Sequence, residues 1–570
     1  SADVETALVD VGDGSHAADY SSKDVRGKIV LADGVLARVQ QLAVAQHGAV
    51  GIVSDMPNQT TAWSGLDRSV IRWGHLDARQ PAGFAFMISR ETAASLRARL
   101  AAGETIILSA KVKAEVGPGH WKVVSGIIAG TDPNSGEIVY SCHLDHERPG
   151  ANDNGSGCVT ILESARILAR LVASGALPRP KRTLLFVWGP EVEGTMAYLS
   201  QHSELRKRLV ADIHMDMVGG DPFKNKSMFH VTATPWSLPS FVTDVGAALA
   251  DVIRAGAANY AETGDAPEAA VVESRAGEQG TRNQFLADVT PYAAGSDHDD
   301  YDSSTLAVPA LYLRDWPDIY IHTDHDTLQQ IDATKLRRIA LLGAAAGYVY
   351  ATLDAKRSQA LLPFYTAQSE IRLAQSFQHA HRLVDEPKLD PNAAWYEARN
   401  LMRQALRSEV ATFHSLTELT ESSELDLTNE KILTDQVTAF NNWIDSQAKA
   451  RGAQGSEPKA PWSGEPAARK IPVRVGDFGP LTYQNDNVLQ ARLTAERLAR
   501  IKLLNSDATA LLNVQDLSEL YAYEIVNFVD GKRTLGEIRD AVSAEYGPLP
   551  IDLVNDYLEA CREAGVVQWK

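Results

Sequence analysis

Cysteine, basic charge and long apolar runs are all scarce in this chain of 570 residues. The three cysteines, Cys142, Cys158 and Cys561, allow at most one internal disulfide and offer no Cys-x-x-Cys pair, so a disulfide scaffold and a zinc knuckle are excluded. Lys+Arg 55 against Asp+Glu 73 gives a formal net charge of -18, which argues against binding to nucleic acid or an anionic membrane. No apolar run reaches the roughly 18 residues needed to cross a bilayer. We therefore expect a water-soluble protein.

A targeting segment is also not visible at the start of the chain. The sequence opens Ser1-Ala2-Asp3, without an initiator Met and without a basic stretch followed by an apolar one. We expect Ser1 to be a processed or trimmed start, and the lack of a leader together with an unpaired third cysteine favours the cytoplasm.

The composition is that of a folded protein with several domains, because 44% of the residues are hydrophobic and 22% charged over a length that exceeds one ordinary core. From about residue 7 to 112, short β-branched runs alternate with helical stretches. From 122 to 355, longer strands and amphipathic helices alternate, which predicts an α/β fold with a mostly parallel sheet covered by helices on both faces. After Pro363 the pattern is helical, and a Gly- and Pro-rich linker at 452–466 precedes a C-terminal helical region. The predicted domains are 1–115, 116–360, 361–465 and 466–570.

Acidic and imidazole side chains gather where predicted strands of the 116–360 domain end. The segments are SCHLD at 141–145, GANDNGSG at 150–157, WGPEVEG at 188–194, HMDMVG at 214–219 and IHTDHDT at 321–327. The carboxyl ends of parallel strands meet at one edge of a sheet, where α/β proteins place their sites. His, Asp and Glu converging there are typical of a zinc site.

Taken singly, each of these residues is more often a helix cap or a solvated turn. The position of His214, inside a strand beside Asp216, favours a structural histidine. His146, His325 and the run 297–300 can equally be solvated loop residues. The ordered set is far more specific than any one member.

This ordered set resembles the M28 family of zinc aminopeptidases over most of 122–355, with GSDH at 295–298 as a sixth shared segment. The resemblance implies a zinc exopeptidase fold. It implies that His143 and Asp216 bind one zinc ion, that Asp153 bridges two ions, that His322 binds the second ion, and that Glu191 is the general base. His298 and Tyr301 are the substrate-binding candidates.

The chemistry of the residues agrees with these roles. Two neighbouring cations need a bridging carboxylate, which suits Asp153, and a Glu that is not a firm ligand can move a proton, which suits Glu191. Asp145, two residues beyond His143, can accept the other ring N–H of that imidazole and fix its tautomer.

One departure from the family pattern concerns the second zinc ion. Many M28 members have two adjacent Glu residues here, whereas this chain has Glu191-Val192-Glu193. Either Glu193 reaches the metal by a changed backbone path, or the second site is weak or empty, since a firm site needs three protein ligands. The expected cofactor is therefore one or two zinc ions.

The flanking regions carry weaker resemblances. Residues 7–112, with DVRGKIVL at 24–31, resemble a protease-associated domain, and the C-terminal helices resemble a winged helix. Five basic residues against eleven acidic ones at 511–570 would repel a phosphate backbone. We expect this region to serve docking or homo-oligomerisation, with a structural lid as the alternative.

The predicted function is a metallo-aminopeptidase that acts on peptides. A carboxypeptidase, a cyclotransferase and a non-catalytic peptide-binding protein remain open as alternatives on the same fold. The acids Glu193 and 297–300 suit a free α-amine, and the motif loops offer only Arg148 and Arg314 to a terminal carboxylate, which favours the aminopeptidase.

Overall fold

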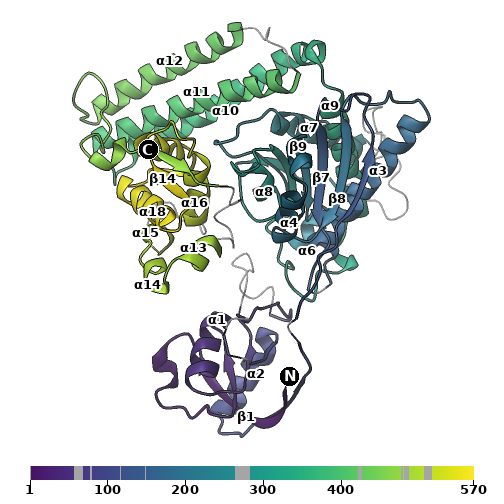
Figure 1. The fold of residues 1–570 in the computed structure, drawn as a ribbon, viewed down its shortest axis with the longest axis vertical. Coiled ribbons are helices and arrows are strands. Elements are labelled where there is room, and N and C mark those ends of the chain that lie inside the picture. The colour runs from purple at the N-terminus through teal and green to yellow at the C-terminus, as the bar shows by residue number, and fades with distance from the viewer. Residues whose placement is uncertain are drawn as a thin grey trace.

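The computed structural model describes residues 2–56, 68–77, 80–81, 83–115, 117–147, 149–263, 283–420, 427–476, 479, 487–505 and 517–570. Figure 1 shows an N-terminal module at the bottom and the α/β domain, central in the sequence, on the right. A group of long helices runs across the top, and a C-terminal helical region lies below these helices on the left.

The N-terminal module is a five-stranded sheet in the order β4 (Ala85–Met87), β3 (Gly51–Ser54), β2 (Ile29–Ala32), β1 (Ala2–Gly12) and β5 (Ile107–Val112). β5 is antiparallel to β1, while β1, β2, β3 and β4 run parallel. Strand β2 is apolar throughout because both its faces are covered, with Val30 and Ile29 in separate core clusters. The covering helices are α1 (Leu36–Val39), its π-helical continuation Gln40–Gln46, and α2 (Arg90–Ala101).

The central domain is a seven-stranded sheet. Its order is β11 (Ala287–Thr290), β10 (Met228–Thr232), β12 (Ala310–Trp316), β9 (Leu209–Asp216), β7 (Glu137–His143), β8 (Thr183–Gly189) and β6 (Val124–Ile128). The four strands from β12 to β8 are parallel, whereas β6 and β10 are antiparallel to their neighbours β8 and β12. The prediction of a mixed α/β fold with a mostly parallel sheet is confirmed.

Helices cover both faces of this sheet because successive apolar residues of each central strand point to opposite sides. In β7, Tyr140 packs into the cluster shared with α3 (Gly157–Ala173), α7 (Val242–Thr263) and α9 (Ala333–Thr352). Val139 packs on the other side, with α4 (Glu193–Gln201), α5 (Ser203–Arg206) and α8 (His298–Asp302). The long, continuous apolar strands of the sequence reflect this burial on both faces.

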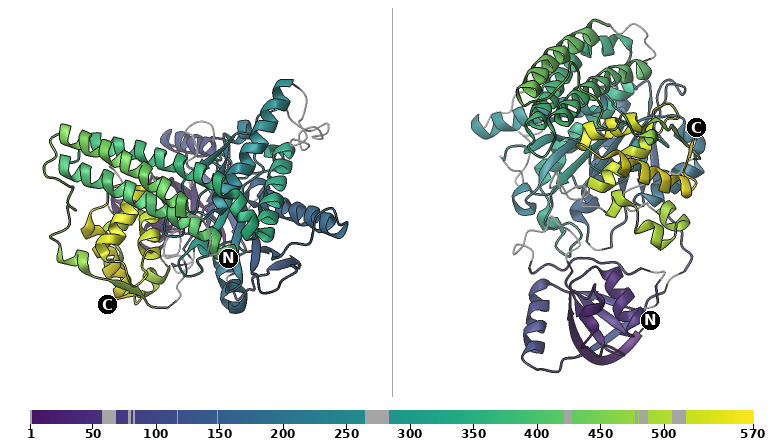
Figure 2. Two further views of the ribbon diagram at one scale, coloured as in Figure 1. Left: turned by 90° about the horizontal axis from the view of Figure 1, so that it is seen from above. Right: turned by 90° about the vertical axis from the view of Figure 1, so that its left-hand side faces the viewer.

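Three long helices follow, α10 (Ala355–Asp385), α11 (Pro391–Thr420) and α12 (Leu427–Ala450), and they lie side by side in both views of Figure 2. Pro363 does not mark the start of this helical region, because it lies inside α10. The packing of α10 along α11 outweighs the backbone hydrogen bond that the proline removes.

The C-terminal region consists of α16 (Leu517–Asn527), α17 (Leu535–Tyr546), α18 (Ile551–Glu563) and β14 (Val567–Trp569), which pairs antiparallel with β13 (Pro472–Arg474). A capping box of Thr534 and Glu537 is present at the start of α17. The short helices are α6 (Pro222–Asn225), α13 (Asn487–Arg492), α14 (Ala495–Leu498) and α15 (Lys502–Asn505). Within the described part of the chain, no helix has the length and apolar character that a membrane span requires.

Candidate metal centre

The candidate site lies at the carboxyl edge of the parallel strands β8, β7 and β9. His143 is the last residue of β7 and Asp216 the last of β9, and these two strands are neighbours. Glu191 follows the end of β8, the neighbour of β7 on its other side. Strand order alone therefore brings three of the predicted residues together.

A first group consists of His143, Asp153 and Asp216, all buried. Nε2 of His143 lies 3.3 Å from a carboxylate oxygen of Asp153 and 3.3 Å from one of Asp216. Neither Nε2 of His143 nor Oδ1 of Asp216 makes a hydrogen bond to another described residue, although both atoms are buried. Buried polar atoms normally have partners, and one imidazole with two carboxylates converging on one point is a donor set that fits zinc.

A second group consists of His146, Asp153 and His322. Oδ2 of Asp153 lies 3.3 Å from Nε2 of His146 and 3.1 Å from Nε2 of His322. Because Oδ1 of Asp153 faces the first group and Oδ2 the second, this one carboxylate spans both. That is the arrangement that a bridge between two cations requires.

The backbone around Asp153 is held by Asp326, a buried residue of the loop after β12. Its two carboxylate oxygens accept the N–H groups of Asn152 and Asp153, at 2.7 and 2.9 Å. The loop that carries His322 thus also fixes the position of the shared carboxylate.

His143 is oriented by Asp145, though not in the predicted way. Nδ1–H of His143 donates to the main-chain carbonyl of Asp145 at 3.1 Å, whereas the Asp145 carboxylate lies 3.9 Å away. That carboxylate accepts the N–H of Glu191 instead, at 2.9 Å. Asp145 therefore links the imidazole to the loop of the predicted base.

The charged groups of the site shift one another's pKa values. Burial would raise the pKa of Asp153, but its three imidazole neighbours outweigh this and hold the pKa well below its usual range. Burial raises the pKa of Glu191 well above its usual range; His143 opposes this rise, and the carboxylates of Asp216, Asp297 and Asp153 add to it. Glu191 thus lies within electrostatic reach of His143, Asp153 and Asp216.

Glu193 belongs to neither group within the described residues. It is exposed at the start of α4, while Val192 before it is buried and donates its N–H to Asp297 at 2.6 Å. Val192 has a φ of 46°, which a β-branched residue rarely adopts. The backbone path is thus unusual, but Glu193 is exposed, and the third member of the group with Asp153 and His322 is His146.

The substrate-binding candidates His298 and Tyr301 are both buried. Both lie in α8 and are 0% and 1% exposed. His298 stacks on Tyr312 at 3.8 Å between ring centroids and donates to the carbonyl of Ala293, while Tyr301 packs in the core behind the sheet. Both side chains thus face the interior of the protein in this structure.

The acidic run 297–300 is buried as well, so it offers no exposed carboxylate. Asp299, for example, accepts hydrogen bonds from Tyr292 and from the N–H of Gly295. His214 is a buried histidine whose ring nitrogens lie 2.8 Å from the hydroxyls of Ser141 and Ser296, consistent with a structural role.

His146 is the residue that sequence reasoning missed. It lies three residues after His143, in the loop between β7 and α3, a position where a solvated loop residue is equally expected. The spacing His-x-x-His directly after a strand is the available signal, and it becomes informative once the loop turns both imidazoles onto Asp153.

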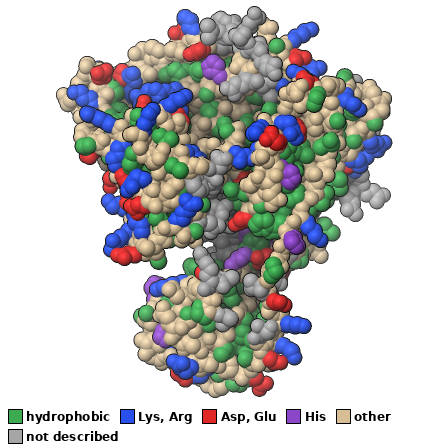
Figure 3. All heavy atoms as spheres, in the orientation of Figure 1, with side chains coloured by type: hydrophobic (Ala, Val, Ile, Leu, Met, Phe, Trp, Pro, Cys, Tyr) green, Lys and Arg blue, Asp and Glu red, His purple; other side chains and the backbone are tan. Residues whose placement is uncertain are grey.

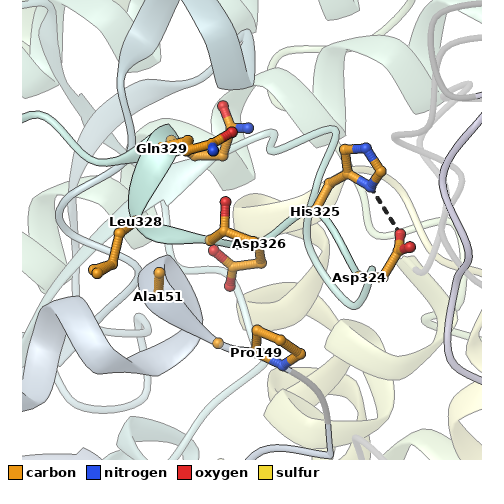
Figure 4. Close-up of a pocket in the computed structure, with 10 residues that line it drawn as sticks. Pro149, Ala151, Asp324, His325, Asp326, Leu328 and Gln329 are labelled. Atoms are coloured by element: carbon orange, nitrogen blue, oxygen red, sulfur yellow. Dashed lines mark hydrogen bonds and ion pairs between the residues drawn. The ribbon is translucent and has the colours of Figure 1, made fainter.

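A cavity of about 670 Å³ borders the loop after β12. Its lining is formed by Pro149, Gly150, Ala151, Asp324, His325, Asp326, Thr327, Leu328, Gln329 and Gln330. Figure 4 shows Asp326 pointing towards Ala151 and Pro149, and His325 paired with Asp324 at 2.8 Å. None of the five residues in the two metal groups lines this cavity.

Residues 124–346 match the model of Peptidase family M28. The match covers the whole central sheet and both metal groups.

Two curated proteins are similar to parts of the chain. Aminopeptidase NAALADL1 of Mus musculus is 34% identical over 99 residues, 16% of this chain and 13% of that protein. Leucine aminopeptidase 1 of Aspergillus oryzae is 42% identical over 77 residues, 12% of this chain and 19% of that protein. The chain thus spans less than a fifth of the length of these relatives in the matched regions. Among solved structures, a zinc aminopeptidase from Bacillus subtilis has 20% identity and a TM-score of 0.42, over 61% of this chain and 75% of that one.

Proposed function

We propose that this chain is a zinc-dependent aminopeptidase whose M28 domain holds two metal ions on either side of Asp153. The observation that carries the proposal is the sharing of this one buried carboxylate between two three-residue groups. Three protein ligands with a further position left for water or substrate are typical of catalytic zinc.

When bound, two zinc ions supply an acidified water and polarise the scissile carbonyl. The protein's own part is the transfer of the proton. Glu191, on the loop between β8 and α4, accepts the proton of the attacking water and returns it to the leaving amine. Asp145 accepts hydrogen bonds from the backbone N–H of Glu191 and from the ring of His143, so it fixes the position of the proposed base relative to that of the proposed ligand.

The charge of the exposed motif residues favours recognition of the amino end of a peptide. Asp145 and Glu193 are exposed carboxylates, each two residues beyond a predicted site residue, His143 and Glu191 respectively. Of the two arginines considered for a terminal carboxylate, Arg148 lies outside the described residues, and Arg314 is held over the rings of Tyr312 and Trp316 at 5.4 and 5.3 Å. The exposed carboxylates of Asp145 and Glu193 therefore suit an α-ammonium group better than a terminal carboxylate.

Acetylation of the substrate tests this orientation. We expect a peptide with a blocked N-terminus to resist cleavage, because the acetyl group removes the charge that the rim carboxylates bind, and a C-terminally amidated peptide to be cleaved at nearly the rate of the free one. Mass spectrometry of the products identifies the end that is trimmed. Trimming of the acetylated peptide from its C-terminus would show a carboxypeptidase instead.

Zinc content distinguishes His146 from Glu193 as the third ligand of the second metal site. His146→Ala should lower the zinc content from two ions to one per chain, because it leaves the second group with two ligands. Glu193→Gln is the matched control and should keep both ions, since that side chain is exposed and in neither group. Atomic emission spectroscopy after gel filtration measures the content. Loss of an ion in Glu193→Gln with none in His146→Ala would reverse the assignment.

We propose further that the flanking regions are a protease-associated module and a winged-helix-like module. In the C-terminal region, β14 follows the helices α16, α17 and α18 and pairs with β13, which precedes them, and this supports the second of these. Its excess of acids favours docking to a protein, including a second copy of this chain, over nucleic acid.

A further inference from the structure

The N-terminal module reaches the metal centre through a short extended segment, residues 70–75. This segment pairs with the loop that follows β12, as Arg72 lies opposite Thr323 in an antiparallel bridge. The N–H of Trp73 donates to the carbonyl of His322 at 2.9 Å, and the N–H of Asp324 donates to the carbonyl of Ile71 at 2.9 Å.

A third bond fixes the register of the pair. The N–H of Ile71 donates to the carboxylate of Asp324 at 2.8 Å, and Arg72 and Thr323 are both buried. Trp73 is therefore held by main-chain bonds directly opposite His322. In Figure 3, histidine and acidic side chains gather where the lower module meets the rest of the molecule.

The indole of Trp73 lies against the two imidazoles of the second metal group. Its ring centroid is 3.5 Å from that of His322 with the planes 30° apart, and 5.0 Å from that of His146 with the planes 31° apart. The Nε2 atoms of the same two rings face Oδ2 of Asp153. One aromatic surface thus supports both imidazoles while their nitrogen atoms converge on one carboxylate oxygen.

The backbone of His322 needs this support. Its φ is 57°, a left-handed conformation that a non-glycine residue keeps only where the surroundings impose it. The bonds from segment 70–75 are made to residues 322 and 324, at and just after this strained position. Residues outside the ligand set that orient metal-binding imidazoles commonly contribute a factor of about 10 to 100 in metal affinity.

We propose that segment 70–75 of the N-terminal module is part of the second metal site, and that Trp73 is its positioning residue, holding His146 and His322 in the orientation that binds the ion. The inference rests on the proposed two-metal function. The N-terminal module then has a role in the metal centre, although segment 70–75 is about 250 residues away from His322 in the sequence.

The test is the affinity of each zinc ion in the full-length chain, measured by competition with a chromophoric chelator. Trp73→Ala should weaken the second zinc ion by roughly 10-fold or more and leave the first within about twofold. Trp73→Phe, which retains an aromatic face, should recover most of the affinity. His75→Ala is the matched control, because this exposed ring packs edge-on against the same indole, with 5.6 Å between ring centroids, and belongs to neither metal group.

Tryptophan fluorescence gives a second readout that does not depend on turnover or on the alanine variant. Binding of the second zinc ion to the wild type should change the emission, and this step should be absent in Trp73→Phe. Equal affinities in wild type and Trp73→Ala, or an equal loss at both sites, would overturn the inference, as would an unchanged fluorescence step in Trp73→Phe. A wild type that binds fewer than two zinc ions would contradict the proposed function itself. Two tightly bound ions in both wild type and Trp73→Ala would contradict only the role of Trp73.

Discussion

Glu191→Gln should lower kcat by roughly 10²- to 10⁴-fold while both zinc ions stay bound. The amide has the size of the carboxylate but cannot accept the proton of the attacking water, so the variant removes one chemical step and leaves the metal groups intact. Glu191 is in neither group, which is why its loss should not release an ion.

The matched control for this experiment is Glu193→Gln, two residues along the same loop and exposed. It removes the same charge near the site. Because Glu193 is a candidate to bind the substrate amine, its loss should raise KM while kcat stays within a few-fold. Single-turnover kinetics and zinc content, measured on the same preparations, separate loss of the proton acceptor from loss of metal. Near wild-type turnover in Glu191→Gln would mean that another group moves the proton.

The second large effect is expected at Asp153. Asp153→Ala should release both zinc ions and abolish activity, because Asp153 is the only residue common to the two groups and its removal leaves each with two ligands. Asp216→Ala should release the first ion alone, since the second group does not contain it.

The number of zinc ions bound per chain should decrease stepwise across these variants, and it can be measured without an activity assay. Two ions are expected in the wild type, one in Asp216→Ala and in His146→Ala, and none in Asp153→Ala, by atomic emission on protein with a native circular dichroism spectrum. Retention of one tightly bound ion in Asp153→Ala would show that the two sites do not share this carboxylate.

Much of this centre follows from sequence because strand order determines which residues meet. The apolar runs of β7, β8 and β9 are long and bounded by turns, so the sequence pattern is enough to place their carboxyl ends, with His143, Glu191 and Asp216, at one edge of the sheet.

The remaining parts depend on loop geometry, which a sequence pattern does not encode. The loop after β7 turns His146 onto Asp153, the positive φ of Val192 turns Glu193 away, and the burial of α8 removes His298 from the site. Trp73 is brought in by main-chain bonds between segments about 250 residues apart, and such pairing leaves no periodicity in either segment.

A crystal structure of the zinc-loaded protein, with anomalous scattering recorded on both sides of the zinc absorption edge, tests the central claim most directly. The account predicts two zinc peaks on opposite sides of the Asp153 carboxylate, one against His143 and Asp216 and the other against His146 and His322. A single peak, or a second one bound by Glu193 in place of His146, would contradict it.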